Sequence, residues 1–171
     1  RPEINFTIQH DSLYLSLSNE PLIHVYSLSD TIFWVKSLDF KPTDFIQIPG
    51  QKEPVTYSQQ ILLNEARIQG IYSDSSHLIV NYTGGIPSEI FVQNELKERK
   101  NFYRYPEFRN TYLKIHQKGS GWSNEIVLPK KIKFILNIES VDKPFYALRN
   151  DEFIGEEQEY LTFYKLKLVR K

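Results

Sequence analysis

Hydrophobic and polar residues alternate along much of the chain, and this period of two is the pattern of half-buried β-strands. The alternation is clearest at 4–9, 13–17, 78–82 and 161–168. β-branched and aromatic residues, which fit a pleated strand, are frequent in the same segments. The pattern therefore predicts an all-β chain.

Polar turns divide these strands into three similar groups. Each group places a turn between its first two strands, at His10-Asp11-Ser12, at 73–76 and at 141–143. Antiparallel strands joined by short turns form meanders, so each group predicts a four-stranded antiparallel sheet. The approximate limits of the groups are 1–45, 61–128 and 130–171.

Repeated four-stranded meanders of this size are typical of β-propeller blades, which bury both faces of each sheet. The segments 30–38 and 160–169 carry apolar residues on both faces, as such burial requires. We therefore predict one β-domain over 1–171 with about three blades, a partial propeller because three blades do not close a ring. The alternative is an irregular β-sandwich or barrel.

Two segments interrupt the strand pattern with weak helical signals. Residues 58–67 could form a short helix capped by Ser58, and residues 88–100 place Ser88 before apolar residues and a charged tail. We predict short helices at both.

The composition narrows the function classes. The 21 Lys and Arg residues balance 21 Asp and Glu residues, which argues against a nucleic-acid partner held by the charge of the whole domain. No apolar run approaches the roughly 20 residues of a membrane span. Zero Cys excludes disulfides and cysteine zinc sites. Because the chain lacks Met and opens on Arg1-Pro2, we expect a piece of a longer product.

A search for catalytic and metal-binding motifs predicts neither kind of site. The histidines show no zinc motif and no carboxylate companion at ligand spacing, and are interpreted as turn or strand-surface residues: His10, His24, His77 and His116. Gly84-Gly85 lacks a phosphate-loop context and is interpreted as a hairpin or bulge pair. Ser120 lacks a nucleophile motif. We therefore predict no catalytic residue, metal site or cofactor.

Two clusters remain as candidate binding sites. The insertion 99–114 interleaves basic and aromatic residues that could stack on sugars while pairing anions. We name Tyr103, Arg104, Tyr105 and the glycine-flanked Trp122 as its candidate ligand-binding residues, expected to lie together on one face. The alternative is a twisted edge strand with inward-facing aromatics. The acidic segment 149–160 lacks regular calcium-loop spacing and is interpreted as a solvated turn.

The segments "IYSDSSHLIVNYTGGIP" and "FYALRNDEFIGEEQEYLTFYKLKLV" resemble the last blades of secreted, often lipid-anchored bacterial six-bladed β-propeller proteins of unknown function. The resemblance implies the C-terminal half of such a ring. It also implies a secreted or cell-surface location, in the periplasm or outer membrane, with any anchor outside this chain. It transfers no catalytic residues.

Two functions are consistent with these observations. The first is a non-catalytic recognition or scaffold module that binds glycan or protein through loop insertions, with the remaining propeller blades or a second copy as further partners. The second is part of a propeller hydrolase or lyase whose active site is completed by residues outside this chain. Fold analogy does not separate them, because propellers host both.

Overall fold

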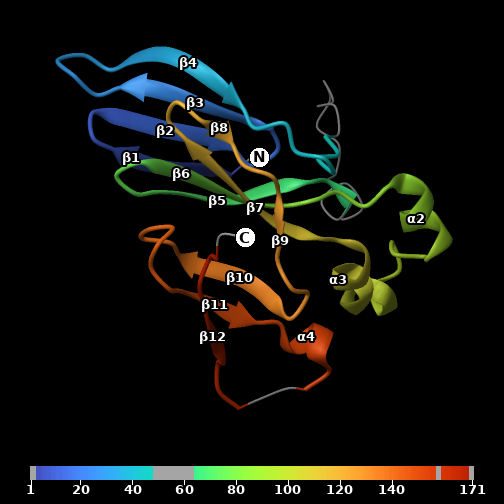
Figure 1. Cartoon of the computed structure of the whole chain (residues 1–171). Coiled ribbons are helices and arrows are strands. Elements are labelled where there is room, and N and C mark those ends of the chain that lie inside the picture. Colours follow the sequence, from blue (N-terminus) through green and yellow to red (C-terminus); the bar gives the residue numbers. More distant parts are fainter. Residues whose placement is uncertain (1–2, 48–63, 157–158, 170–171) are drawn as a thin grey trace.

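The computed structural model describes residues 3–47, 64–156 and 159–169, and contains three antiparallel β-sheets stacked one upon the next (Figure 1). The first sheet lies at the top of the view, the second in the middle and the third at the bottom. The predictions of an all-β chain and of three antiparallel strand groups are confirmed.

Each sheet takes its strands from one segment of the chain. The first sheet has the order β1-β2-β3-β4, with β1 at Ile4–Gln9, β2 at Ser12–Leu17, β3 at Leu22–Ser27 and β4 at Phe33–Asp39. The second sheet contains β5 at Arg67–Ser73, β6 at His77–Thr83, β7 at Thr111–Gln117, β8 at Gly121–Trp122 and β9 at Ile126–Val127. The third sheet has the order β10-β11-β12, at Ile132–Asn137, Phe145–Arg149 and Phe163–Leu166.

The expected four strands per sheet occur only in the first sheet. In the second sheet β8 and β9 both pair with β7, at its two ends. Between them the Ser123 N–H donates to the Ile115 carbonyl at 2.7 Å, so Gly121 to Val127 acts as one interrupted edge strand. Within the described residues, the third sheet has three strands. The acidic segment 149–160, interpreted as a solvated turn, contains the short helix α4 (Asp151–Ile154).

Both faces of the second sheet are buried against a neighbouring sheet. Along β6, Leu78, Val80 and Tyr82 pack with Ile23 and Phe40 next to the first sheet. The intervening Ile79 packs with the third sheet, in a core that also contains Leu113, Ile135, Phe145 and Ala147. Because successive residues of a strand point to opposite faces, this strand contributes to two separate cores.

The first strands of the first two sheets lie side by side. The Asn5 side-chain amide donates to the Ile68 carbonyl at 3.3 Å, and the Thr7 and Ser73 hydroxyl groups are 2.8 Å apart. The contact between β1 and β5 is therefore polar, unlike the apolar contacts between the later strands.

The segment after β4 crosses the second sheet and is fixed there by polar contacts. Glu125 accepts hydrogen bonds from the Thr43 N–H at 2.8 Å, from the Thr43 hydroxyl at 2.7 Å and from the Tyr82 hydroxyl. The Tyr112 hydroxyl donates to Asp44. Burial, reinforced by the Asp44 carboxylate, raises the pKa of Tyr112 to about 12, so this tyrosine stays a donor at neutral pH.

Gly84 and Gly85 lie at the close approach of this segment to the end of β6, and the prediction of a hairpin or bulge pair is wrong. A Cβ built on Gly85 would lie 2.4 Å from the Ile46 Cβ and 2.8 Å from the Asn64 carbonyl oxygen. Real Cβ atoms do not approach so closely, so glycine is required here for lack of space.

The insertion between β6 and β7 is helical and projects from one end of the second sheet (Figure 1). It contains α2 (Ser88–Gln93), the 3₁₀-helix η1 (Arg99–Arg104) and α3 (Tyr105–Phe108). The predicted helix after Ser88 is confirmed over its first six residues, and most of the one at 58–67 lies outside the described residues. No helix in the described part of the chain is long and apolar enough to span a membrane.

Candidate functional site

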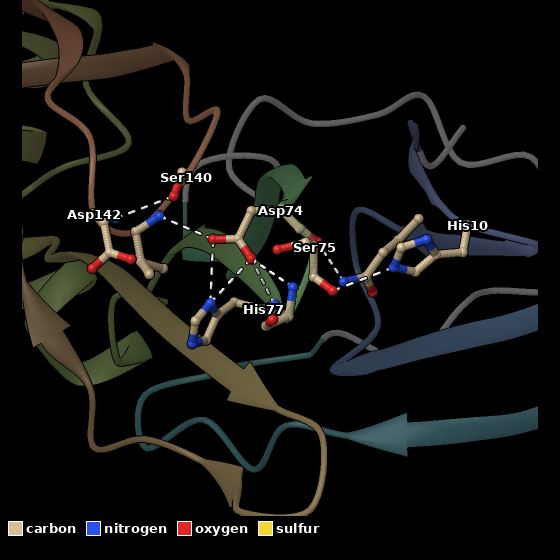
Figure 2. Close-up of polar contacts among 9 residues, drawn as sticks. His10, Asp74, Ser75, His77, Ser140 and Asp142 are labelled. Carbon is tan, nitrogen blue, oxygen red and sulfur yellow. Dashed lines mark hydrogen bonds and ion pairs between the residues drawn. The ribbon is translucent and has the colours of Figure 1, made fainter.

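The first hairpin turns of the three sheets meet around Asp74 (Figure 2). Asp74 begins the turn between β5 and β6, and one carboxylate oxygen accepts the N–H groups of Ser76 and His77, each at 2.8 Å. This is an Asx turn, in which a side chain replaces a backbone acceptor. The other oxygen accepts the Val141 N–H from the third sheet's turn at 3.1 Å.

The first sheet's turn is attached to the same point. The Gln9 side-chain amide donates to the Asp74 carbonyl, and His10 Nε2 lies 3.3 Å from the Ser75 carbonyl oxygen. All three predicted turns therefore join the first two strands of their sheets, and the turn of the second sheet lies between the other two (Figure 2).

The electrostatics of Asp74 follow from its surroundings. Burial alone would raise the pKa of this carboxyl group. The N–H groups of Ser76, Val141 and His77, together with the His77 imidazole, outweigh burial and lower the pKa from 3.8 to about 2. Asp74 is therefore a carboxylate throughout the neutral range.

A pocket of about 430 Å³ lies beside these turns, between the second and third sheets; we call it the turn pocket. Its polar lining includes His77, Gln117 and Asp142, and its apolar lining includes Ile115, Ile126 and Val141. The volume is in the range of small-ligand sites, and a few polar groups beside an apolar wall are the usual composition of such sites.

His77 belongs both to the turn cluster and to the pocket lining. Its Nδ1 is 3.0 Å from an Asp74 oxygen, and because a carboxylate only accepts, Nδ1 carries the proton in this bond. Figure 2 shows the other ring nitrogen on the side away from Asp74. A ligand in the pocket could therefore hydrogen-bond to this second ring nitrogen.

The Asp74–His77 pair has the same hydrogen bond as the base half of a hydrolytic triad, but the described residues do not complete one. Ser120 and Ser123 also line the pocket, yet neither hydrogen-bonds to His77. The Ser123 hydroxyl instead donates to the Asn124 carbonyl at 2.7 Å and accepts the Ile115 N–H at 3.0 Å. The arrangement can bind and orient a ligand, and it presents no activated nucleophile.

The structure separates the four residues that the sequence analysis named as ligand-binding. Tyr103 is 62% exposed on η1. Arg104 pairs with Glu107 and lies over the Phe108 ring. Tyr105 packs against the core of the insertion, stacked on Phe91 at a ring separation of 6.2 Å.

Trp122 lies at the other end of β7 from the insertion. It pairs with His116 near the end of that strand, whereas the insertion joins the strand at Thr111. Trp122 is part of the turn-pocket lining, but its ring packs against Phe40 and His116 at centroid separations of 5.9 and 5.0 Å. The expectation that these four residues share one face is therefore wrong.

The sequence analysis missed the role of His77. It found no carboxylate companion for any histidine, because it compared their spacing with metal-ligand motifs. The informative signal was the short sequence Asp-Ser-Ser-His at 74–77, since Asp before a tight turn often accepts the N–H groups two and three residues later.

The acidic segment 149–160 is largely ion-paired where it is described. Arg149 pairs with Asp151 and Glu156, and Lys133 pairs with Glu152 at 3.2 Å. Among the described residues, no three His, Asp or Glu side chains are grouped as metal ligands would be.

No family model matches the chain, and no curated protein matches it.

Proposed function

We propose that this chain is a non-catalytic recognition module, in which three β-propeller blades hold the turn pocket and the pocket binds a peptide segment of a protein partner. The observation that carries the proposal is the turn pocket itself, about 430 Å³ in volume and bordered by turns that Asp74 fixes to one another. A binding site built on a fixed scaffold needs little ordering when its ligand arrives, which favours binding.

Three features support the blade arrangement. The second sheet is buried on both faces, as an internal blade is. The first strands of two successive sheets are neighbours, and the first turns of all three sheets lie together. The contact between first turns occurs both between the first and second sheets and between the second and third sheets, a repetition for which an irregular sandwich gives no reason.

The lining of the turn pocket favours a peptide over a glycan. Sugar binding commonly uses an open aromatic face, and Trp122, the aromatic residue of the lining, has its ring packed against Phe40 and His116. The apolar wall of Ile115, Ile126 and Val141 fits an aliphatic side chain instead. His77 and Gln117 are placed to bond with main-chain amide groups.

The location that we propose, secreted or at the cell surface, rests on the sequence resemblance alone. The resemblance also supports further propeller blades as partners, and these could complete a catalytic site in the alternative hydrolase or lyase. The turn pocket supports the recognition function more directly, because its described lining contains no activated nucleophile.

The test selects peptides from a random 12-residue phage library against the wild-type chain and measures their affinity by fluorescence polarisation. Ser120 is exposed and lines the pocket, so Ser120→Trp should obstruct the pocket without disturbing the core. We expect selected peptides to carry an aliphatic residue and to bind this variant at least roughly tenfold more weakly, a change of about 1.4 kcal/mol.

Ser29→Trp is the matched control, because Ser29 is exposed in the turn before β4. It should leave peptide affinity unchanged. A glycan array tested with the same three proteins distinguishes the ligand classes. If no peptide is selected and the chain binds a glycan that Ser120→Trp no longer binds, the ligand of the turn pocket is a sugar and not a peptide.

A further inference from the structure

The outer side of the first sheet is an apolar face that nothing covers among the described residues. Along β1, Ile4, Phe6 and Ile8 are each more than half exposed, while the residues between them contact the second sheet through polar groups. The strand therefore turns its polar side inward and its apolar side outward. This is the reverse of the usual arrangement for a sheet packed on a core.

Strand pairing extends this face onto the other three strands, where it also contains the hydrogen-bonded polar pair His24 and Ser37. Leu17, Leu15 and Leu13 are directly opposite Ile4, Phe6 and Ile8, and residues in direct opposition share a face. The same reasoning continues from Leu13 to Tyr26 and from Tyr26 to Trp34. We call this set the first outer face: Ile4, Phe6, Ile8, Leu13, Leu15, Leu17, Tyr26 and Trp34.

The third sheet has a corresponding apolar face on its own outer side. Phe134, Leu148 and Phe163 are in successive opposition across its three strands, and Tyr146 lies on the same side of β11 as Leu148. Their neighbours Phe145 and Ala147 are buried on the inner side. We call Phe134, Tyr146, Leu148 and Phe163 the third outer face. Exposed apolar faces of this kind mark interaction sites.

The position of the first outer face indicates what covers it. In β6, the second, fourth and sixth residues are Leu78, Val80 and Tyr82, and they form the side that the first sheet covers. In β2, the second, fourth and sixth residues are the three leucines of the first outer face. The first outer face therefore corresponds to the side of the second sheet that receives a preceding sheet.

The third outer face is the corresponding opposite side of the stack. It lies where the third sheet would receive a following sheet, as the second sheet receives the third. A second copy of this chain carries the same two outer faces. Its third outer face is in position to cover the first outer face of this copy, and its first outer face is in position to cover the third. Contacts between different faces of identical chains are head-to-tail and either close a ring or continue into a filament.

Sheet number decides between these outcomes. Propellers typically close with about four to eight blades, and the described residues of one chain form three sheets. Two copies supply twice three, or six, which falls in this range; three copies would supply nine, which does not. We propose that two copies associate head to tail, with the third outer face of each covering the first outer face of the other, and so close a six-sheet ring. This inference rests on the blade arrangement proposed above.

The experiment introduces a charged side chain into one outer face at a time. Phe6→Lys alters the first outer face, where Phe6 is 64% exposed, and Phe163→Glu alters the third, where Phe163 is 43% exposed. Val92→Glu on α2 is the control, because Val92 is 63% exposed and belongs to neither face. The mass of each protein is measured by light scattering and sedimentation over a range of concentrations. Circular dichroism and the thermal midpoint report folding, and Ile8→Lys and Tyr146→Glu replace any variant that fails to fold.

We expect the wild type and Val92→Glu to have twice the 20.2 kDa mass of one chain. Phe6→Lys and Phe163→Glu alone should each have the mass of one chain, because each alters both interfaces of the ring. Mixing these two variants in equal amounts should restore the doubled mass. Their heterodimer keeps one wild-type interface and places Lys against Glu in the other.

Other outcomes overturn the proposal. If Phe163→Glu stays dimeric while Phe6→Lys does not, the first outer faces pair with each other; the reverse result pairs the third outer faces. Growth beyond the dimer indicates an open filament. If the wild type stays monomeric at every concentration, the two outer faces are covered by another polypeptide or by further blades, and not by a second copy. None of these results affects peptide binding at the turn pocket, which one chain forms by itself, so this inference and the proposed function can fail separately.

Discussion

Asp74 shows how one side chain can fix the relative positions of neighbouring turns. Its carboxylate is 10% exposed and accepts N–H groups from its own turn and from the third sheet. Removing the carboxylate leaves these donors without a buried acceptor. We expect Asp74→Ala to lower the free energy of unfolding by about 2 to 3 kcal/mol, measured by urea titration at pH 7.

The lowered pKa of Asp74 also predicts a pH dependence. The folded-state pKa is about 2 and the ordinary value is 3.8. Asp74 therefore contributes about 2 kcal/mol above pH 4, and this contribution is lost as the pH falls through 2. Asp74→Asn keeps one acceptor oxygen but does not titrate, so its unfolding free energy should fall less between pH 4 and pH 2 than that of the wild type. Equal losses would contradict the assignment.

Gly84 and Gly85 provide a matched pair for testing the close approach of the segment after β4. A Cβ on Gly85 would meet Ile46 at 2.4 Å, whereas a Cβ on Gly84 would meet the nearest atom, in Asp44, at 3.1 Å. We expect Gly85→Ala to cost about 1 to 3 kcal/mol, as overpacking typically does, and Gly84→Ala to cost less. Thermal midpoints of the two variants provide the comparison. Equal midpoints would show that the crossing segment moves freely.

The helical insertion is the element whose role differs most from the sequence-based expectation. Tyr105 stacks on Phe91 and donates its hydroxyl to the Leu96 carbonyl, so it holds the insertion together. We expect Tyr105→Ala to lower stability by about 2 to 4 kcal/mol, as loss of a packed aromatic side chain does. Exposed Tyr103 serves as the control, and Tyr103→Ala should change stability by less than about 0.5 kcal/mol. Urea titration measures both, and similar losses would contradict this role for Tyr105.

Local patterns and long-range contacts differ in how well the sequence predicts them. The alternation and the turns at 10–12, 73–76 and 141–143 depend on neighbouring residues, so the strands and first hairpins could be predicted. The packing of Tyr105 depends on Phe91, and the need for Gly85 depends on Ile46; neither partner is adjacent in sequence. The turn pocket joins β6, β7 and the third sheet, so no single segment indicated it.

At the scale of the whole molecule, the two cores between the sheets meet in the second sheet, where β6 and β7 each contribute to both. Leu78 lies in the core shared with the first sheet, and Ile79 lies in the core shared with the third. Both side chains are buried, and the substitutions Leu78→Ala and Ile79→Ala remove similar numbers of side-chain atoms. We expect each variant to lose about 2 to 4 kcal/mol of global stability. The two variants should differ in which pair of neighbouring sheets is weakened locally.

Amide hydrogen exchange can locate these effects, because it reports opening in each part of a structure separately. When stacked units contact only their neighbours, a cavity on one side weakens mainly the interface on that side. Leu78→Ala should therefore speed exchange more in β2 and β3 than in β10 and β11, and Ile79→Ala should do the reverse. If both variants speed exchange equally in all four strands, the sheets unfold as one core. An irregular sandwich would then describe the molecule better than stacked blades, and the closed ring of two copies would lose its structural basis.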